Sequence, residues 1–230
     1  MSVISQSNEF NVHDTLIELT KTIDEDTVAI SLSSGIDSMS VLFALLECKK
    51  NVVVYSFTLE DRESRDFREA KSLAKSLGLT FVPIILPTDI ETLKQDVLML
   101  GNDYHCKKKT DYICTWPYLY LTKAVKEKIL ATGMAADGHF VISKKGVLHY
   151  KNDVETFRKN YFSNPSRCQL PQRTKLAEEC GLKLFEPYLT KEMYDYLLHS
   201  TWEECNKPQQ KMPIRRAFEY PTMHQHTIFN

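Results

Sequence analysis

The stretch that most constrains the fold is a short apolar run at 27–32, TVAISL, which is followed at once by the polar loop SSGIDS at 33–38. A run of this kind is typical of a strand buried in a sheet. Gly35 permits backbone conformations that a Cβ hinders, and Asp37 and Ser38 are favourable residues at the start of a helix. Apolar residues at helical spacing follow the loop. The sequence therefore predicts a buried strand, a tight polar loop and a helix.

This junction suits the binding of a phosphate group. Where a strand leads into a helix, several backbone N–H groups and the positive end of the helix dipole face one spot. The hydroxyl groups of Ser33, Ser34 and Ser38 add hydrogen-bond donors, and the carboxylate of Asp37 can hold Mg²⁺ between phosphates. Serine and glycine are also ordinary loop residues, so the junction alone leaves phosphate binding open.

Strands and helices alternate after this junction. Apolar runs predict further strands at 51–57, 80–86 and 129–132, and segments with helical spacing lie between them. The stretch 101–117 has no clean period, and an irregular loop is expected there. This rhythm predicts an α/β fold with a parallel sheet, helices on both faces and a helical C-terminal part. Ligands of such sheets bind beyond the carboxyl ends of the strands.

The composition argues against several classes of protein. The chain has 29 Lys and Arg residues against 30 Asp and Glu residues, so no overall basic charge indicates nucleic acid as a partner. Six cysteines occur without a C-x-x-C pair, which argues against a zinc knuckle. The chain starts without a signal-peptide pattern, and no apolar run reaches membrane-spanning length. We expect a cytoplasmic protein with reduced thiols.

Three segments carry a resemblance to a known family. The loop at 33–38 resembles the S-G-G-x-D-S pyrophosphate loop of the PP-loop ATP pyrophosphatases, with Ser34 where these enzymes usually have a glycine. The segment GMAADGHF at 133–140 resembles the G-E-G-A-D-E-x-F signature of the asparagine synthetase branch, and KMPIRRAF at 211–218 resembles its K-x-x-L-R-x-A-F element. The segments occur in family order, and the G-x-x-x-x-G-K-[ST] motif of P-loop NTPases does not occur in the sequence.

The resemblance implies a PP-loop, HUP-like fold and a set of site residues. Enzymes of this branch cleave ATP between the α and β phosphates, adenylate a substrate and release pyrophosphate with the help of Mg²⁺. The implied Mg²⁺ ligands are Asp37 and Asp137, and the implied sources of positive charge in the transition state are Lys211 and Arg215. The implied pyrophosphate ligands are Ser33, Ser34, Gly35 and Ser38. The implied adenosine contacts are Leu59, Thr132 and Gly133.

Four positions besides Ser34 depart from the family pattern. Met134 and Gly138 replace the two glutamates of the second signature, and the first glutamate is tied in asparagine synthetases to the attack of ammonia on the acyl adenylate. Leu184 and Thr190 replace the arginine and the aspartate of an R-x-P-F-L-D stretch. Because methionine can neither accept a proton nor orient an ammonium, adenylation is better supported than amide formation with ammonia.

The predicted organisation is a helical lead-in at 1–26, one synthetase domain at 27–220 and a tail at 221–230. Asparagine synthetases carry a glutaminase domain ahead of the synthetase domain. The chain leaves no room for that domain, so we expect the synthetase half alone, with a separate glutaminase as one source of ammonia.

The function expected from these features is that of an ATP-dependent, AMP-forming amide ligase. Such an enzyme adenylates a small-molecule carboxylate, aspartate by analogy, and transfers the acyl group to ammonia or another amine. Two alternatives stay open: a PP-loop enzyme that modifies a nucleobase of tRNA, and a non-catalytic ATP-binding module. Release of pyrophosphate from ATP separates the binding module from an enzyme.

Overall fold

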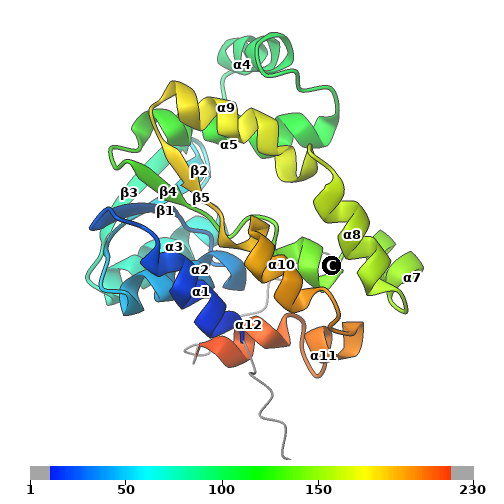
Figure 1. Ribbon diagram of the computed structural model, residues 1–230. Helices are drawn as coiled ribbons and strands as arrows, with labels where there is room; N and C mark the ends of the chain where they lie inside the picture. Colours follow the sequence, from blue (N-terminus) through cyan, green and yellow to red (C-terminus); the bar gives the residue numbers. More distant parts are fainter. Residues whose placement is uncertain (1–10, 219–230) are drawn as a thin grey trace, which may run out of the picture.

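The structure, a computed structural model, describes residues 11–218 and is built around one five-stranded, all-parallel sheet (Figure 1). The strand order is β3-β2-β1-β4-β5. The strands are β1 Thr27–Ser31, β2 Asn51–Leu59, β3 Thr80–Leu86, β4 Ile129–Ala131 and β5 Lys183–Phe185. The order reverses between β1 and β4, so the loops that follow these two strands diverge, which is where open α/β sheets bind ligands. The predicted parallel sheet is confirmed.

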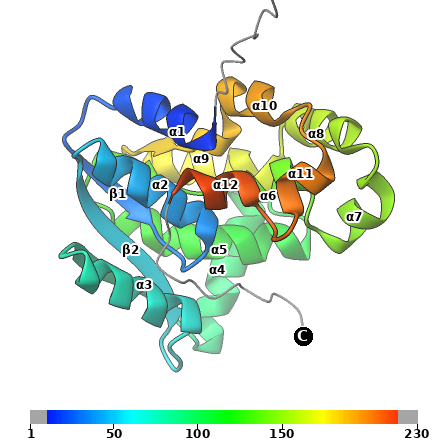
Figure 2. The ribbon, with the colours of Figure 1, turned by 90° about the horizontal axis from the view of Figure 1, so that it is seen from below.

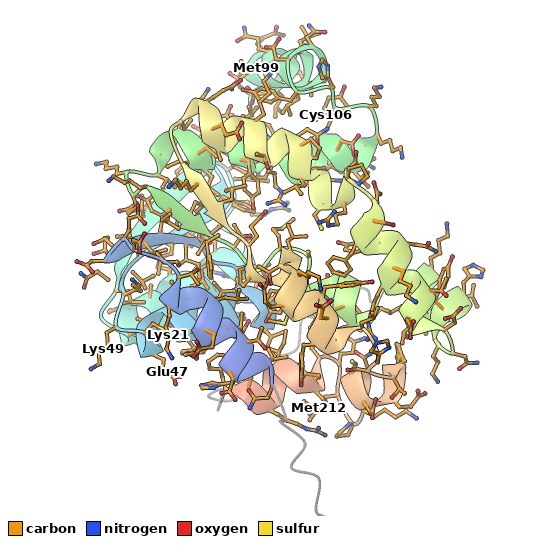
Figure 3. The ribbon with its side chains drawn as sticks, viewed as in Figure 1. Lys21, Glu47, Lys49, Met99, Cys106 and Met212 are labelled. Carbon is orange, nitrogen blue, oxygen red and sulfur yellow. The ribbon has the colours of Figure 1, made fainter. Side chains whose placement is uncertain are left out.

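Helices cover both faces of the sheet, as predicted. One face carries α1 Val12–Lys21, α2 Ile36–Glu47, α3 Arg65–Ser76 and α12 Met212–Ala217, and Figure 2 shows α12 beside α1 and α2. The other face carries α4 Ile90–Asn102, α5 Lys109–Ala124 and α9 Leu170–Glu179. Each face has its own apolar cluster of buried side chains. In Figure 3, Met99 on α4 and Met212 on α12 accordingly lie at opposite ends of the molecule.

The predicted helical C-terminal part lies beside the sheet. It comprises α6 Ala136–Phe140, α7 Lys144–Tyr150, α8 Val154–Ser163, α10 Lys191–Leu197, α11 Trp202–Asn206 and two 3₁₀ turns, Arg167–Gln169 and Pro187–Leu189. The side chain of Arg158 on α8 is fully buried among these helices. Its guanidinium donates to the carbonyl oxygens of His139 at 2.7 Å, Leu198 at 3.0 Å and Ser200 at 2.5 Å. One arginine thus joins α6, α8 and the segment after α10.

The irregular loop expected at 101–117 is correct only for 103–108 and is wrong for the rest of the stretch. Helix α4 continues to Asn102, and α5 begins at Lys109 and passes through Pro117. Buried residues surround much of α5, so its sequence lacks the single apolar stripe of a surface helix. The buried carboxylate of Asp96 on α4 accepts hydrogen bonds from Trp116 Nε1 at 2.7 Å and from the Tyr120 hydroxyl at 2.6 Å. These two hydrogen bonds hold α4 and α5 together.

The ends of the chain bear on the predicted domain boundaries. Within the lead-in predicted at 1–26, helix α1 packs Val12 and Leu16 into the apolar cluster shared with α2 and β1, so it is part of the same core. The tail predicted at 221–230 lies outside the described residues. Across residues 11–218, none of the helices combines the length and the apolar character that a bilayer span requires.

Candidate functional site

The loop between β1 and α2 has the predicted conformation of a tight polar junction. Gly35 occupies the N-cap position of α2, and no side chain caps this end of the helix. The N–H group of Ser33 donates to Ser38 Oγ at 3.2 Å, and the N–H group of Gly35 donates to Ser33 Oγ at 3.2 Å. The two hydroxyl oxygens are 3.1 Å apart. The backbone donors of the loop therefore converge on a small polar centre at the positive end of the helix dipole.

The loop after β4 touches this junction at Gly133. A Cβ at Gly133 would lie 2.5 Å from the backbone carbon of Asp37 and 2.5 Å from the backbone nitrogen of Ser38. Neither of those backbone atoms can move away without displacing the start of α2. Glycine is required at this position because the two loops approach each other at backbone distance.

Lys211 joins the two aspartates of these loops. Its Nζ lies 2.6 Å from Asp37 Oδ2 and 2.6 Å from Asp137 Oδ1. The side chain of Lys211 is 11% exposed, that of Asp37 is 21% exposed and that of Asp137 is 63% exposed. The structure thus brings together three of the four residues predicted as catalytic, although Lys211 follows Asp37 by 174 positions.

The backbone around Lys211 fixes the direction of its side chain. Lys211 is the N-cap residue of α12 and has a left-handed backbone with φ of 61°. Its N–H group donates to Asn206 Oδ1 at 3.3 Å, and Asn206 Nδ2 donates to the carbonyl oxygen of Phe140 at 2.8 Å. The segment that carries Lys211 is therefore anchored to α6, the helix whose second residue is Asp137.

The charge of Lys211 follows from these contacts. Burial of the ammonium lowers its pKa, but the negative charges of Asp37 and Asp137 and their hydrogen bonds outweigh that effect. The pKa of Lys211 is consequently raised above its ordinary value. Lys211 stays protonated at neutral pH and is a fixed positive charge in the site.

A cavity of about 650 Å³ opens at the carboxyl ends of β1, β2 and β4. Six of the residues predicted to bind substrate line it: Ser33, Asp37, Ser38, Leu59, Thr132 and Gly133. A second cavity of about 740 Å³ lies between α1, α11 and α12 and is lined by none of the predicted site residues. The position of the first cavity agrees with the ligand site expected for a parallel sheet.

Sequence reasoning missed the wall of the cavity that α5 forms. This wall consists of five consecutive or nearly consecutive side chains: Ile113, Cys114, Trp116, Pro117 and Tyr118. Residues three and four apart share one face of a helix, so their spacing contains a usable signal. The missing period at 101–117 conceals this signal, because it favours a loop over a helix. The sequence also gave no sign of Asp66, which lines the cavity from α3.

The remaining predicted residues lie near the site without lining the cavity. Ser34 is 5% exposed, and its Oγ lies 3.5 Å from Asp66 Oδ1. Gly35 is on the same loop. Arg215 is half-buried, and its Nε donates to the carbonyl oxygen of Gln210 at 2.8 Å. Within residues 11–218, no ion pair joins Arg215 to an aspartate, so its role in charge stabilisation stays a prediction.

A buried polar network supports the loop after β4. The carboxylate of Glu186 accepts a hydrogen bond from Thr132 Oγ1 at 3.1 Å and forms a buried ion pair with Arg173 on α9. The N–H group of Met134 donates to Thr132 Oγ1 at 3.2 Å. Arg173 Nε also donates to the carbonyl oxygen of Cys168 at 2.8 Å. The network fixes the backbone of Thr132 and Met134 against the strands, which keeps the cavity wall in place.

Glycine is required at position 138 because the side chain of Tyr161 occupies the adjacent space. A Cβ at Gly138 would overlap the aromatic ring of Tyr161 on α8. A glutamate, as the family signature has here, does not fit while Tyr161 occupies this space. The departure at Gly138 is therefore part of the packing between α6 and α8.

Comparisons with known proteins bear on this site. The family described as asparagine synthase matches residues 18–222 of the chain. A search of curated proteins found no significant match. Among solved structures, the chain is similar to a protein from Methanocaldococcus jannaschii described as a predicted subunit of tRNA methyltransferase, with a TM-score of 0.41 and 16% identity over 75% of this chain and 72% of that chain. Since the family match spans the strands, both signature loops and Lys211, the chain belongs to the asparagine synthase family.

Proposed function

We propose that the chain is an ATP-dependent, AMP-forming ligase that adenylates a small carboxylic acid, releases pyrophosphate and passes the acyl group to ammonia or another amine. The observation that carries the proposal is the cluster of Lys211, Asp37 and Asp137 beside the polar loop and the cavity. Membership of the family supports an ATP-dependent PP-loop enzyme. The choice of acid and of amine belongs to the proposal.

The two aspartates fit the chemistry of Mg²⁺. One ammonium nitrogen lies within 2.6 Å of a carboxylate oxygen of each, so a single cation can touch both side chains. Across the described residues, no group of three or more His, Cys, Asp or Glu side chains could hold a metal alone. This agrees with Mg²⁺, which uses one or two carboxylates and completes its coordination with water and substrate phosphates. When bound, Mg²⁺ would offset the charge that develops on the leaving pyrophosphate.

The polar loop would hold the pyrophosphate end of ATP. The N–H groups of Ser33 and Gly35 point to one small region of the loop, where each donates a hydrogen bond to a serine hydroxyl. Phosphate oxygens can replace these hydroxyls as acceptors without a change in the backbone. Lys211 remains protonated and would place its ammonium against the same phosphates, because its anchored backbone brings Nζ to this end of the cavity.

The rest of the cavity would orient the nucleoside and the acid. Leu59 at the end of β2 and Thr132 and Gly133 after β4 line the same cavity as the loop, in agreement with adenosine contacts. Met134 lines the cavity directly beyond Gly133. It cannot act as a base, so deprotonation of the attacking amine would depend on the amine itself, on solvent or on a separate protein. A separate glutaminase stays a proposal for the source of ammonia.

A non-catalytic ATP-binding module is the second candidate, and Met134 is the observation that favours it. Binding of ATP alone would not require a buried lysine held between two aspartates. The experiment is acid-dependent release of pyrophosphate from Mg²⁺-ATP by the purified full chain, compared with Asp37→Ala. We expect release that depends on an acid and is lost in the variant. ATP binding without release under any acid would favour the binding module.

A further inference from the structure

We propose that the acid adenylated at this site is apolar beyond its reacting carboxylate, and that its apolar part contacts the α5 wall, formed by Ile113, Cys114, Trp116, Pro117 and Tyr118, together with Met134. This inference rests on the proposed function and names its substrate class. It disfavours acids with a second carboxylate, such as aspartate.

The first argument is the charge of the cavity. Its lining includes the charged side chains of Asp37 and Asp66, and both are acidic. In the described part of the chain, no lysine, arginine or histidine side chain lines it. A second carboxylate of a substrate would be desolvated there without a cation as partner, which is strongly unfavourable.

Two buried cations close to the cavity are already paired with carboxylates. Arg173 lies behind the wall, with its guanidinium carbon 5.4 Å from the centre of the Tyr118 ring, but it is fully buried and ion-paired to Glu186. Lys211 reaches Asp37 and Asp137 at the phosphate end. Neither side chain lines the part of the cavity that α5 forms.

The second argument is the orientation of the polar atoms on α5. Trp116 donates its indole N–H to the carboxylate of Asp96 on α4, at 2.7 Å. The wall therefore receives the carbon surface of the indole. Cys114 is a neutral thiol at physiological pH, since burial raises its pKa. The N–H group of Met134, which also lines the cavity, already donates a hydrogen bond to Thr132 Oγ1 at 3.2 Å.

The third argument is the exposure of the apolar groups at the mouth. The side chain of Ile113 is 58% exposed although it lines the cavity, and Phe57 on the same lining is 39% exposed. The polar residues of the lining, in contrast, gather at the strand ends, at the serine loop and at the start of α3. Binding of an apolar group would remove the exposed carbon surface of Ile113 from water.

The test is acid-dependent exchange of labelled pyrophosphate into ATP by the full chain. The probes are hexanoate and phenylacetate on one side and aspartate and glutamate on the other. The perturbing variant is Ile113→Arg. The matched control is Leu98→Arg on α4, a residue with 63% exposure that does not line the cavity. Binding of ATP is measured separately by calorimetry.

We expect the wild-type chain to use at least one apolar acid with a kcat/KM at least tenfold above that for either dicarboxylate. Ile113→Arg should lower this kcat/KM about tenfold, mainly through KM, and should leave the Kd for ATP within about twofold. Leu98→Arg should change neither quantity.

Two outcomes would overturn the inference alone and leave the ligase proposal standing. The first is pyrophosphate exchange that prefers aspartate or glutamate. The second is a loss of ATP affinity in Ile113→Arg that is as large as the loss of kcat/KM for the acid. In that case the wall would contact the nucleotide and not the acid. Absence of exchange with every acid, with ATP still bound, would overturn the ligase proposal and this inference together.

Discussion

Replacement of Lys211 by methionine tests whether the lysine holds the two aspartates together. The substitution keeps an unbranched side chain that ends one atom earlier, and it removes the ammonium. Loss of one partner of a buried ion pair costs about 3–5 kcal/mol, whereas exposed pairs contribute about 1 kcal/mol or less. Asp137 is 63% exposed and Asp37 is 21% exposed, so the loss lies between these limits. We expect Lys211→Met to lower the free energy of unfolding by about 2 kcal/mol and Tm by about 4–8 °C.

The response of this variant to Mg²⁺ alone gives the sharper result. In the wild-type chain, Mg²⁺ without ATP has to compete with an ammonium for the same carboxylate oxygens. In Lys211→Met, the two carboxylates face each other without a cation, so Mg²⁺ binding offsets their repulsion. Millimolar MgCl₂ in the absence of nucleotide should therefore raise the Tm of the variant and leave the Tm of the wild type almost unchanged. The assay is thermal unfolding followed by circular dichroism.

A surface lysine provides the matched control. Lys191 is 81% exposed and pairs with Asp195 on α10, so Lys191→Met should change neither the Tm nor its response to MgCl₂. If MgCl₂ shifts the Tm of the wild type and of Lys211→Met by the same amount, the lysine does not occupy the place of the metal. The reasoning from the three contacts would then be wrong.

Three further predictions concern residues close to the site. Gly133→Ala should lower the free energy of unfolding by about 2 kcal/mol in urea titrations and weaken ATP binding, because its Cβ would lie 2.5 Å from the backbone of the α2 start. Gly138→Glu should destabilise the chain, and the additional change Tyr161→Ala should recover most of the loss, since the Tyr161 ring occupies the space required. Burial lowers the pKa of His139 to about 3, helped by the charge of Arg158 and opposed by the hydrogen bond to the Tyr188 carbonyl oxygen. In the unfolded chain the imidazole of His139 has its ordinary pKa of about 6.5, so the unfolded state binds a proton more tightly than the folded state. The free energy of unfolding should therefore fall by about 2 kcal/mol between pH 6.5 and pH 5.

Each of these predictions has a simple control. Gly101→Ala on α4 meets the mobile hydroxyl end of Tyr112 as its closest neighbour, so it should be tolerated where Gly133→Ala is not. Equal losses in the two variants would contradict the argument from backbone contact. Failure of Tyr161→Ala to improve Gly138→Glu would show that another group excludes the glutamate. His139→Gln should reduce the acid slope, and an unchanged slope would assign it to other groups.

Most of the sheet could be predicted because its signals are local. The runs at 27–32, 51–57 and 80–86 are largely apolar and bounded by polar or turn residues, and each is a strand in the structure or overlaps one. Strand β5 is only three residues long, Lys183–Phe185, and such a segment has no measurable period. It exists because its backbone pairs with β4, a contact between distant parts of the chain.

The α5 wall shows where local signals fail. The stretch 101–117 has no clean period and many polar groups, so its sequence favours a loop over a regular surface helix. Helix α5 is stabilised by tertiary contacts instead, among them the hydrogen bonds from Trp116 and Tyr120 to Asp96. Because the part of α5 at 109–117 is not expected to be helical from the sequence, the residues that it places on the cavity are not identified either.

The sequence by itself determined the two loops, the residue types in them and their order along the chain. Short-range sterics, glycine positions and helix-start preferences act within a few residues, so their effects can be predicted without knowledge of the tertiary structure. Only the tertiary structure decided that Lys211 lies between Asp37 and Asp137, that Glu186 supports Thr132 and that Tyr161 excludes a side chain at position 138. These contacts join segments far apart in the chain, and their geometry depends on how the whole core packs.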